Sequence, residues 1–320
     1  MRRSPVGGNG ANVTALGFGG APIGNLYRVI DDQTARLAVA AAWEGGIRYF
    51  DTAPHYGLGL SERRLGAALR EQPRAEFTIS TKVGRLLVPN PSPTGSDLET
   101  GGFAVADILR REYDYSRDGV LRSLESSLDR LGVDRIDIVY VHDPEDHMEP
   151  ALHEAVPALV ELRDEGVIGA VGAGMNFVEP LRRFVTETDT DVVMVAGRWT
   201  LVDRSAASLL EDCLDRGVAV VAAAPFNSGL LSRPEPPDDA RFDYEPAPPD
   251  LLAAARACAQ ACIAHATTLP TAALQFPLLH PAVCSVVAGM RTAHQCALNL
   301  EWASTEIDEH LWAALPEAVR

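Results

Sequence analysis

A short pattern recurs along the chain: a segment with helical periodicity ends at glycine, and a run of β-branched residues follows it. The pattern occurs four times, at 44–47, 131–133, 165–167 and 216–218. In each case the glycine stands where a helix commonly ends in a left-handed residue. The periodicity is clear before the second of these glycines, because leucines recur three or four residues apart over 117–131. The pattern predicts helices that alternate with buried strands.

Strand-like runs follow these glycines and recur between them. The runs at 136–141, 168–171 and 218–221 are almost continuously apolar, which is typical of parallel strands buried on both faces. Further strands are predicted at 13–16, 47–50, 77–81, 191–195 and 284–287. Eight strands with helices between them predict an α/β fold of the (β/α)8 TIM-barrel class.

Two segments are too long, and too rich in proline or glycine, to be simple connections. Residues 84–116 follow the third predicted strand, and residues 232–249 follow the seventh. Both are expected to project from the C-terminal face of the barrel, where long loops usually shape an active site. Residues 308–318 predict a short closing helix. Because there is neither a low-complexity tail nor a linker, residues 1–320 are expected to form a single barrel domain.

The composition argues against some classes of binding partner and indicates the cellular compartment. Hydrophobic residues make up 47% of the 320 residues, which is enough to build a core. The net charge of −16 argues against nucleic-acid partners and anionic membrane surfaces. No apolar run approaches the roughly 18 residues of a membrane span, and the N-terminus lacks the apolar core of a secretory signal. Five scattered cysteines are too few for a disulfide framework, so a reduced, cytoplasmic protein is expected, and a homo-oligomer is left open.

Three ionisable residues stand where predicted strands end, namely Asp51, Lys82 and His142, and Tyr56 follows the first of them closely. In a barrel these strand ends converge at the mouth. A free phenol has a pKa of about 10, too high for efficient proton transfer near neutral pH. A nearby ammonium favours the phenolate, a carboxylate holds that ammonium in place, and an imidazole can orient a substrate oxygen. The set therefore predicts a tyrosine that exchanges a proton with a carbonyl or alcohol oxygen while hydride is transferred.

Other interpretations of these residues stay open. A lysine at a strand end in a barrel can be a nucleophile, so a Schiff-base lyase is one alternative. A module that binds a nucleotide as a redox sensor, without turnover, is another. Taken singly, Asp51 could be only a helix or loop cap, and His55, beside Tyr56, is either a substrate contact or an ordinary loop histidine.

Two further patterns carry little weight. Cys258, Cys262 and His265 fall on one helical face, but no fourth ligand is evident, so buried small cysteines are expected and no metal is predicted. The glycine-rich segments at 17–20 and 169–174 lack the order of a Rossmann dinucleotide motif. They are expected to let the backbone turn tightly at the rim of the barrel.

The residues around Tyr56 carry a resemblance to a known family. The run at 45–57, followed by Ser-Glu at 61–62 and Leu-Gly at 65–66, resembles the signature of the aldo-keto reductase superfamily, and Thr-Lys at 81–82 and Val-His at 141–142 match its later blocks in order. The resemblance implies a barrel that binds NADP or NAD without a Rossmann domain. It also implies that Asp51, Tyr56, Lys82 and His142 form a catalytic tetrad in which Tyr56 is the general acid and base.

A narrower resemblance concerns the substrate. The segments 82–90, 114–116, 196–201 and 226–231 resemble the D-threo-aldose 1-dehydrogenase branch, which includes L-fucose dehydrogenases and is similar to pyridoxal 4-dehydrogenases. This implies oxidation of an aldose of the L-fucose or D-arabinose type at C1 to a lactone. The alternative is an NADPH-dependent reductase of aldehydes or ketones, including pyridoxal-type substrates, on the same site.

The resemblance also implies a set of residues that bind the cofactor. In it the residue at 176 would hold the carboxamide, the segment 227–230 would clasp the pyrophosphate, and the segment from 289 would face the adenosine half, with Arg291 fitting either NADP or NAD. The implied set is Gly20, Asp51, Asn176, Asn227, Ser228, Gly229, Leu230, Gly289, Arg291, Gln295 and Asn299. Two positions depart from the family pattern: Ala223 stands where many members have a tyrosine that stacks on the nicotinamide, and Ala196 stands where many have a glutamine.

Overall fold

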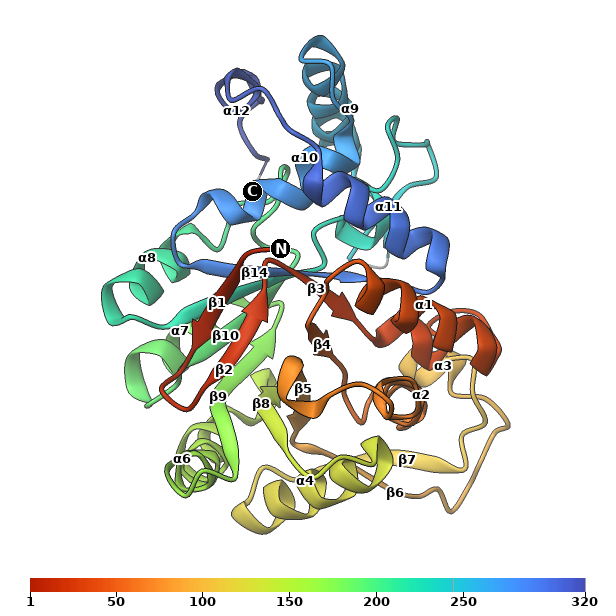
Figure 1. Cartoon of the computed structure of the whole chain (residues 1–320), viewed down its shortest axis with the longest axis vertical. Helices are drawn as coiled ribbons and strands as arrows, with labels where there is room; N and C mark the ends of the chain where they lie inside the picture. Colours follow the sequence, from red (N-terminus) through yellow and green to blue (C-terminus); the bar gives the residue numbers. More distant parts are fainter. Residues whose placement is uncertain (244, 320) are drawn as a thin grey trace.

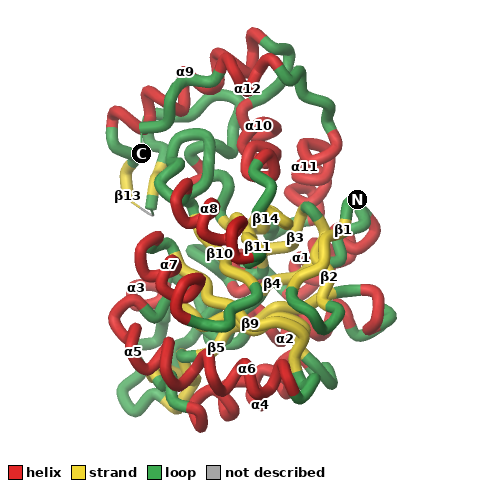
Figure 2. Tube along the Cα trace, turned by 90° about the vertical axis from the view of Figure 1, so that its left-hand side faces the viewer, coloured by secondary structure: helices red, strands yellow, loops and turns green. Residues whose placement is uncertain are grey.

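The computed structural model describes residues 1–243 and 245–319, and a closed barrel of parallel strands lies at its centre. Each barrel strand pairs with the next along the chain, and the last pairs with the first. Figure 2 shows these strands surrounded by helices. The barrel strands are β3 (Leu16–Gly19), β4 (Tyr49–Asp51), β5 (Thr78–Val83), β8 (Ile136–His142), β9 (Ile168–Met175), β10 (Val192–Ala196), β11 (Ala219–Ala223) and β14 (Val283–Gly289). The predicted (β/α)8 class is confirmed.

Helices connect the barrel strands and cover their outer faces. Three of them, α9, α10 and α12, gather at one end of the molecule, at the top of Figure 1. None of the described helices is long and apolar enough to cross a membrane. The helices are α1 (Asp32–Glu44), α2 (Leu60–Leu69), α3 (Leu98–Gly101), α4 (Arg117–Leu131), α5 (Met148–Pro150), α6 (Val156–Asp164), α7 (Val178–Glu187), α8 (Ala207–Arg216), α9 (Pro249–Ala264), α10 (Leu269–Gln275), α11 (Ala293–Ser304) and α12 (His310–Ala314), with short turns of helix at η1 (Ala21–Gly24), η2 (Arg74–Glu76), η3 (Glu145–His147), η4 (Ala151–Ala155), η5 (Asn227–Gly229) and η6 (Phe276–Leu279).

The glycines of the recurring pattern end helices as predicted, with one shift. Gly132, Gly166 and Gly217 have φ of 65°, 75° and 70°, in the left-handed region that glycine adopts without strain. In the first copy the left-handed residue is Gly46, with φ of 86°, whereas Gly45 keeps φ of −74°. The pattern therefore locates the helix ends to within one residue.

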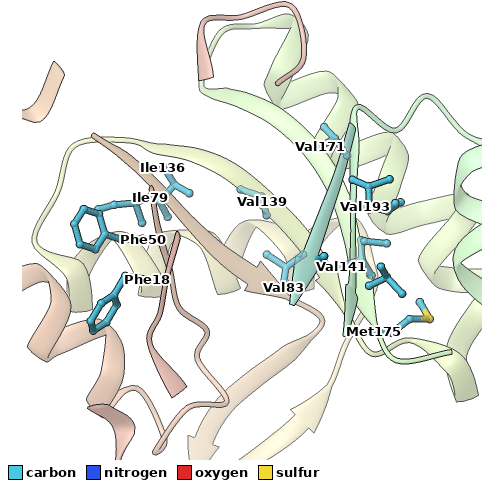
Figure 3. Packing of buried hydrophobic residues seen from close by; sticks show 14 of the residues in the cluster. Phe18, Phe50, Ile79, Val83, Ile136, Val139, Val141, Val171, Met175 and Val193 are labelled. Carbon is cyan, nitrogen blue, oxygen red and sulfur yellow. The ribbon is translucent and has the colours of Figure 1, made fainter. Parts of the chain in front are cut away.

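The barrel strands are buried on both faces, which explains their continuous apolar runs. In β8, Val139 and Val141 pack outward with Val83 and Val171 of neighbouring strands, as Figure 3 shows. The alternating residues of β8 belong to a second cluster inside the barrel, where Tyr140 lies 3.1 Å from Tyr49, hydroxyl oxygen to hydroxyl oxygen.

The N-terminal strand prediction at 13–16 is wrong in its extent. Residues 11–14 form β2 (Ala11–Thr14), which pairs antiparallel with β1 (Arg3–Val6), and the barrel begins only at Leu16. Figure 1 shows this hairpin in front of the barrel. Its buried residues Val6 and Val13 pack in the same cluster as Tyr140, so the hairpin closes one end of the barrel.

Both long segments leave the C-terminal ends of barrel strands. After β5, residues 84–116 form a hairpin of β6 (Arg85–Pro89) and β7 (Leu109–Tyr113) with α3 at its tip. After β11, the second segment contains a two-residue pair, β12 (Arg241–Phe242) and β13 (Glu245–Pro246). The closing helix predicted near the C-terminus is α12.

Candidate active site

The four predicted catalytic side chains meet in one cavity. Asp51 ends β4, Lys82 stands near the end of β5, and His142 ends β8. Tyr56 lies in the loop between β4 and α2. All four line a cavity of about 650 Å³. The C-terminal ends of parallel barrel strands therefore bring together residues that lie up to 91 positions apart, as Asp51 and His142 do.

Lys82 and Asp51 form a buried ion pair. The Lys82 Nζ atom lies 2.8 Å from each carboxylate oxygen of Asp51, and it also donates to the Thr52 carbonyl at 2.9 Å. The two side chains are only 2% and 4% exposed. Burial lowers the pKa of Lys82, but Asp51 and Tyr56 together outweigh that effect, and the pKa is raised above its usual value. The lysine is thus held as an ammonium.

Tyr56 lies against this ammonium. The Lys82 Nζ atom is 4.7 Å from the centre of the Tyr56 ring. Burial raises the pKa of Tyr56 to about 12, although the positive charge of Lys82 opposes the rise. Without a bound cofactor or substrate, the phenol is therefore protonated at neutral pH and is a proton donor.

His142 is a neutral imidazole. Burial and the cations Arg85 and Lys82 hold the pKa of His142 well below its ordinary value. The Nε2 atom lies 3.4 Å from an Asp143 carboxylate oxygen, whereas Nδ1 is buried and has no hydrogen-bond partner within the described residues. A proton on Nδ1 would be a buried donor without an acceptor, so the proton belongs on Nε2. The ring thus presents an N–H group beside the carboxylate.

Signature residues around Tyr56 hold the loop in place. The hydroxyl of Ser61 donates to the Gly20 carbonyl at 2.8 Å and lies 2.9 Å from the Thr52 hydroxyl oxygen. A Cβ atom at Gly24 would lie 2.8 Å from the Tyr56 carbonyl oxygen, closer than side chains approach, so only glycine fits there. Glu62 is fully buried, where it accepts hydrogen bonds from Thr81 and Arg130. These residues position Tyr56 and do not contact the cavity themselves, apart from Gly20.

Most of the predicted cofactor residues line the same cavity. They are Gly20, Asp51, Asn227, Ser228, Gly229, Gly289, Arg291, Gln295 and Asn299. Asn176 and Leu230 are not among the lining residues. The chain has left the cavity wall after Met175, and the Asn176 carbonyl accepts from Arg198 at 2.9 Å. Leu230 is 0% exposed in an apolar cluster, and its N–H already donates to the Asn227 carbonyl. For these two residues the cofactor contact stays a prediction.

The remaining lining residues fit a long, two-ended anionic ligand such as a dinucleotide. The Asn227 Oδ1 atom and the Arg291 Nε atom are buried without a hydrogen-bond partner within the described residues. Gln295 lies in the first turn of α11, whose N-terminus favours anions, and Asn299 follows one turn later on the same face. Ala196 and Ala223 also line the cavity, so neither a tyrosine ring nor a glutamine amide is available at these positions.

The sequence interpretation missed a second polar group beside the four residues. Arg85 of β6 binds the Asp143 carboxylate at 2.7 Å, and Asp143 lines the cavity. On the same hairpin, Arg111 is held by Asp97 and contacts the Nδ1 atom of His55, whose ring centre lies 5.6 Å from that of His142. The position of Asp143 directly after a strand-end histidine was the available signal.

Known proteins resemble this chain over nearly its whole length. The model of the "Aldo/keto reductase family" matches residues 15–320. The chain is 48% identical to D-threo-aldose 1-dehydrogenase of a Pseudomonas species, covering 97% of this chain and 95% of that protein. It is 38% identical to pyridoxal 4-dehydrogenase of Microbacterium luteolum over the same shares, 97% and 95%. The holo form of an aldo-keto reductase from Bacillus halodurans superposes with a TM-score of 0.78 at 25% identity, covering 100% of this chain and 98% of that one.

Proposed function

Because the chain belongs to the aldo/keto reductase family, as its signature predicted, we propose that it oxidises an aldose at C1 to the lactone, with Tyr56 as the general acid and base. It is an NAD(P)-dependent oxidoreductase that acts on a small molecule. The observation that carries the proposed mechanism is the contact of Tyr56 with an ammonium that is itself fixed by both oxygens of Asp51. The similarity to an aldose 1-dehydrogenase along nearly the whole chain supports the sugar substrate.

Each of the four side chains has a separate role in the transfer of one proton. Oxidation of the C1 alcohol removes a hydride from carbon and a proton from oxygen, and the bound dinucleotide supplies the hydride acceptor. Tyr56, as phenolate, takes the hydroxyl proton. Lys82 stabilises the phenolate by its charge, and Asp51 keeps Lys82 in position. The Nε2–H of His142 donates to the substrate oxygen and orients it.

A second candidate is the reverse reaction on the same site, an NADPH-dependent reduction of aldehydes or ketones, including pyridoxal-type substrates. The pKa of Tyr56, raised by burial to about 12, favours this direction because the phenol holds its proton at neutral pH. Tyr56 then protonates the carbonyl oxygen as hydride arrives, and the other three residues keep the same roles. Arg291 donates to the Leu26 carbonyl at 2.7 Å through one nitrogen and leaves its Nε unpartnered within the described residues, which accommodates NADP or NAD.

The test follows the absorbance of reduced nicotinamide with L-fucose, D-arabinose and L-galactose, each with NAD and with NADP. We expect reduced cofactor to form with at least one pair. Tyr56→Phe is expected to abolish nearly all turnover while dinucleotide binding, followed by fluorescence quenching, is retained. Consumption of reduced cofactor with pyridoxal or simple aldehydes, and none formed with any sugar, would select the reductase. A Tyr56→Phe enzyme that keeps most of its activity contradicts the mechanism.

Other expectations from the sequence stay predictions. They are a single domain over residues 1–320, a cytoplasmic location and the lack of a nucleic-acid partner. The oligomeric state stays open, with a homo-oligomer as one alternative. The net charge of −16 remains the argument against polyanionic partners.

A further inference from the structure

Beside the four proposed catalytic side chains stands a carboxylate that the proton transfer does not use. Asp143 lines the cavity, and its side chain is 30% exposed there. One of its carboxylate oxygens lies 2.7 Å from an Arg85 nitrogen and 3.4 Å from the Nε2 atom of His142. The carboxylate therefore sits next to the N–H group that is proposed to orient the substrate oxygen.

Asp143 is held firmly in this position. Its backbone has a φ of 40°, in the left-handed region, and its N–H donates to the Gly174 carbonyl at 3.0 Å. The Tyr115 hydroxyl donates to the carbonyl of His142 at 2.9 Å and also lies 3.2 Å from the carbonyl of Asp143. The side chain of Arg85 is only 11% exposed. A strained backbone that the surrounding residues fix in this way is often found at functional sites.

We propose that the Asp143 carboxylate accepts a hydrogen bond from the hydroxyl on C2 of the aldose, and so makes this site selective for substrates with a hydroxyl next to the reacting carbon. The inference rests on the proposed aldose oxidation and names the part of the sugar that the enzyme recognises. Neither Arg85 nor Asp143 takes part in the proton transfer itself.

The chemistry of a cyclic sugar singles out that hydroxyl. His142 orients the oxygen on C1, and the Asp143 oxygen lies only 3.4 Å from the His142 nitrogen, so the group that reaches it is carried by an atom bonded to C1. In a pyranose, C1 is bonded to C2 and to the ring oxygen. The ring oxygen has no hydrogen to donate, and an ionised carboxylate only accepts. The C2 hydroxyl is the donor that remains.

The electrostatics of Asp143 suit a site that receives a donor. Burial raises the pKa of Asp143 to about 6, with a further rise from Glu145, while Arg85 and Lys82 lower it. The carboxylate is ionised at neutral pH, and burial removes part of its hydration. A hydroxyl donor from the substrate makes up for the hydrogen bonds to water that are lost. Hydrogen bonds to an ionised acceptor are stronger than those between neutral groups.

The experiment compares the best aldose substrate with its 2-deoxy analogue in the wild type and in Asp143→Asn. Asparagine has the same size and tolerates a left-handed backbone. In the wild type, we expect kcat/KM to fall on the order of 10- to 100-fold when the C2 hydroxyl is absent, as for loss of a hydrogen bond to a charged group. Asp143→Asn should lower kcat/KM for the full aldose by a similar factor, but for the 2-deoxy sugar by less than about 3-fold.

A matched control removes a carboxylate from the hairpin that carries Arg85, the partner of Asp143. Glu112 is half exposed on β7, where it pairs with Arg110, and Glu112→Gln should leave both substrates unchanged. Circular dichroism and dinucleotide binding report whether Asp143→Asn is folded. If it is not, the wild-type comparison alone decides, because a 2-deoxy penalty below about 3-fold overturns the proposal.

The outcomes separate this inference from the proposed function. Aldose oxidation with an equal loss on both sugars in Asp143→Asn, or with no loss on either, overturns the role of Asp143 alone. A wild-type enzyme that oxidises no aldose with either cofactor overturns the proposed function and this inference together. A 2-deoxy penalty that disappears in Asp143→Asn supports both.

Discussion

The buried ion pair between Lys82 and Asp51 leads to a prediction about stability that can be measured without substrate. In Lys82→Met the Asp51 carboxylate loses a partner that lies 2.8 Å from each of its oxygens. The Ser80 hydroxyl, at 2.7 Å, is then its remaining side-chain donor within the described residues. Since the Asp51 side chain is only 4% exposed, water cannot replace the ammonium. Breaking a buried pair from one side costs about 3–5 kcal/mol, and we expect a loss of that size.

The double variant separates the cost of the unpaired charge from the cost of lost packing. Asp51→Asn combined with Lys82→Met removes both charges and keeps both side chains near their original size. Replacing both members of a buried pair is often close to neutral, so the double variant should recover most of the about 3–5 kcal/mol that Lys82→Met loses. The third variant of the cycle is Asp51→Asn alone. All three variants should lack turnover, since each disturbs the environment of Tyr56.

The assay is equilibrium unfolding in urea, followed by tryptophan fluorescence and by circular dichroism on the wild type and the three variants. Coincident transitions with the two probes justify a two-state free energy. An exposed pair, Arg110 with Glu112, serves as a control cycle, because its side chains are 47% and 49% exposed and such pairs contribute about 0–1 kcal/mol. Single-variant losses that add to the double-variant loss within about 0.5 kcal/mol would refute the reasoning.

Two predictions concern pH. Because burial raises the pKa of Tyr56 to about 12, aldose oxidation, which needs the phenolate, should quicken as pH rises, whereas carbonyl reduction, which needs the phenol, should not; initial rates in the two directions from about pH 6 to about pH 10 test this, and an oxidation rate that falls over that range contradicts it. Burial raises the pKa of Asp143 from 3.8 to about 6, so ionisation of Asp143 lowers folding stability as pH rises through that window. Urea unfolding should therefore show Asp143→Asn gaining about 1–2 kcal/mol on the wild type between about pH 4 and about pH 7, a value reduced for partial exposure, and an unchanged difference would contradict it.

The barrel was predictable because its signals are local. The leucine spacing over 117–131 gave α4 with the bounds Arg117–Leu131, and Gly132 ends it with φ of 65°. The first strand was misjudged for a physical reason: a strand of the closing hairpin and a strand of the barrel both bury side chains in the same core. Val13 packs inside the barrel cluster, so its pattern could not reveal that its hydrogen-bonded partner is β1.

In the candidate site, too, some residues were predictable from the sequence and others were not. Asp51, Lys82 and His142 were found because strand ends in a barrel converge, which is a rule about topology and needs no side-chain geometry. The pairing of Arg85 with Asp143 spans 58 residues and depends on how the segment 84–116, which follows β5, folds back as a hairpin. Asn176 stands one residue beyond the end of β9 and is not among the residues that line the cavity, so its cofactor contact stays a prediction. Sequence therefore locates residues on regular elements better than residues whose position depends on how the long loops fold.

The distribution of charge in the cavity argues for a neutral sugar and against phosphorylated or carboxylated substrates. Close to Tyr56, each cation has a carboxylate partner: Lys82 has Asp51, Arg85 has Asp143, and Arg111 has Asp97. A substrate phosphate or carboxylate would have to displace one of these carboxylates and leave it without its partner, which is costly where water is scarce. Arg233 and Arg291 line the part of the cavity formed by the segment after β11 and the start of α11, and their positive charge suits a dinucleotide. This distribution of charge supports the proposed aldose substrate, with an anionic cofactor at one end of the cavity and an uncharged sugar at the other. Of the three paired carboxylates, Asp143 is the one that lies 3.4 Å from His142.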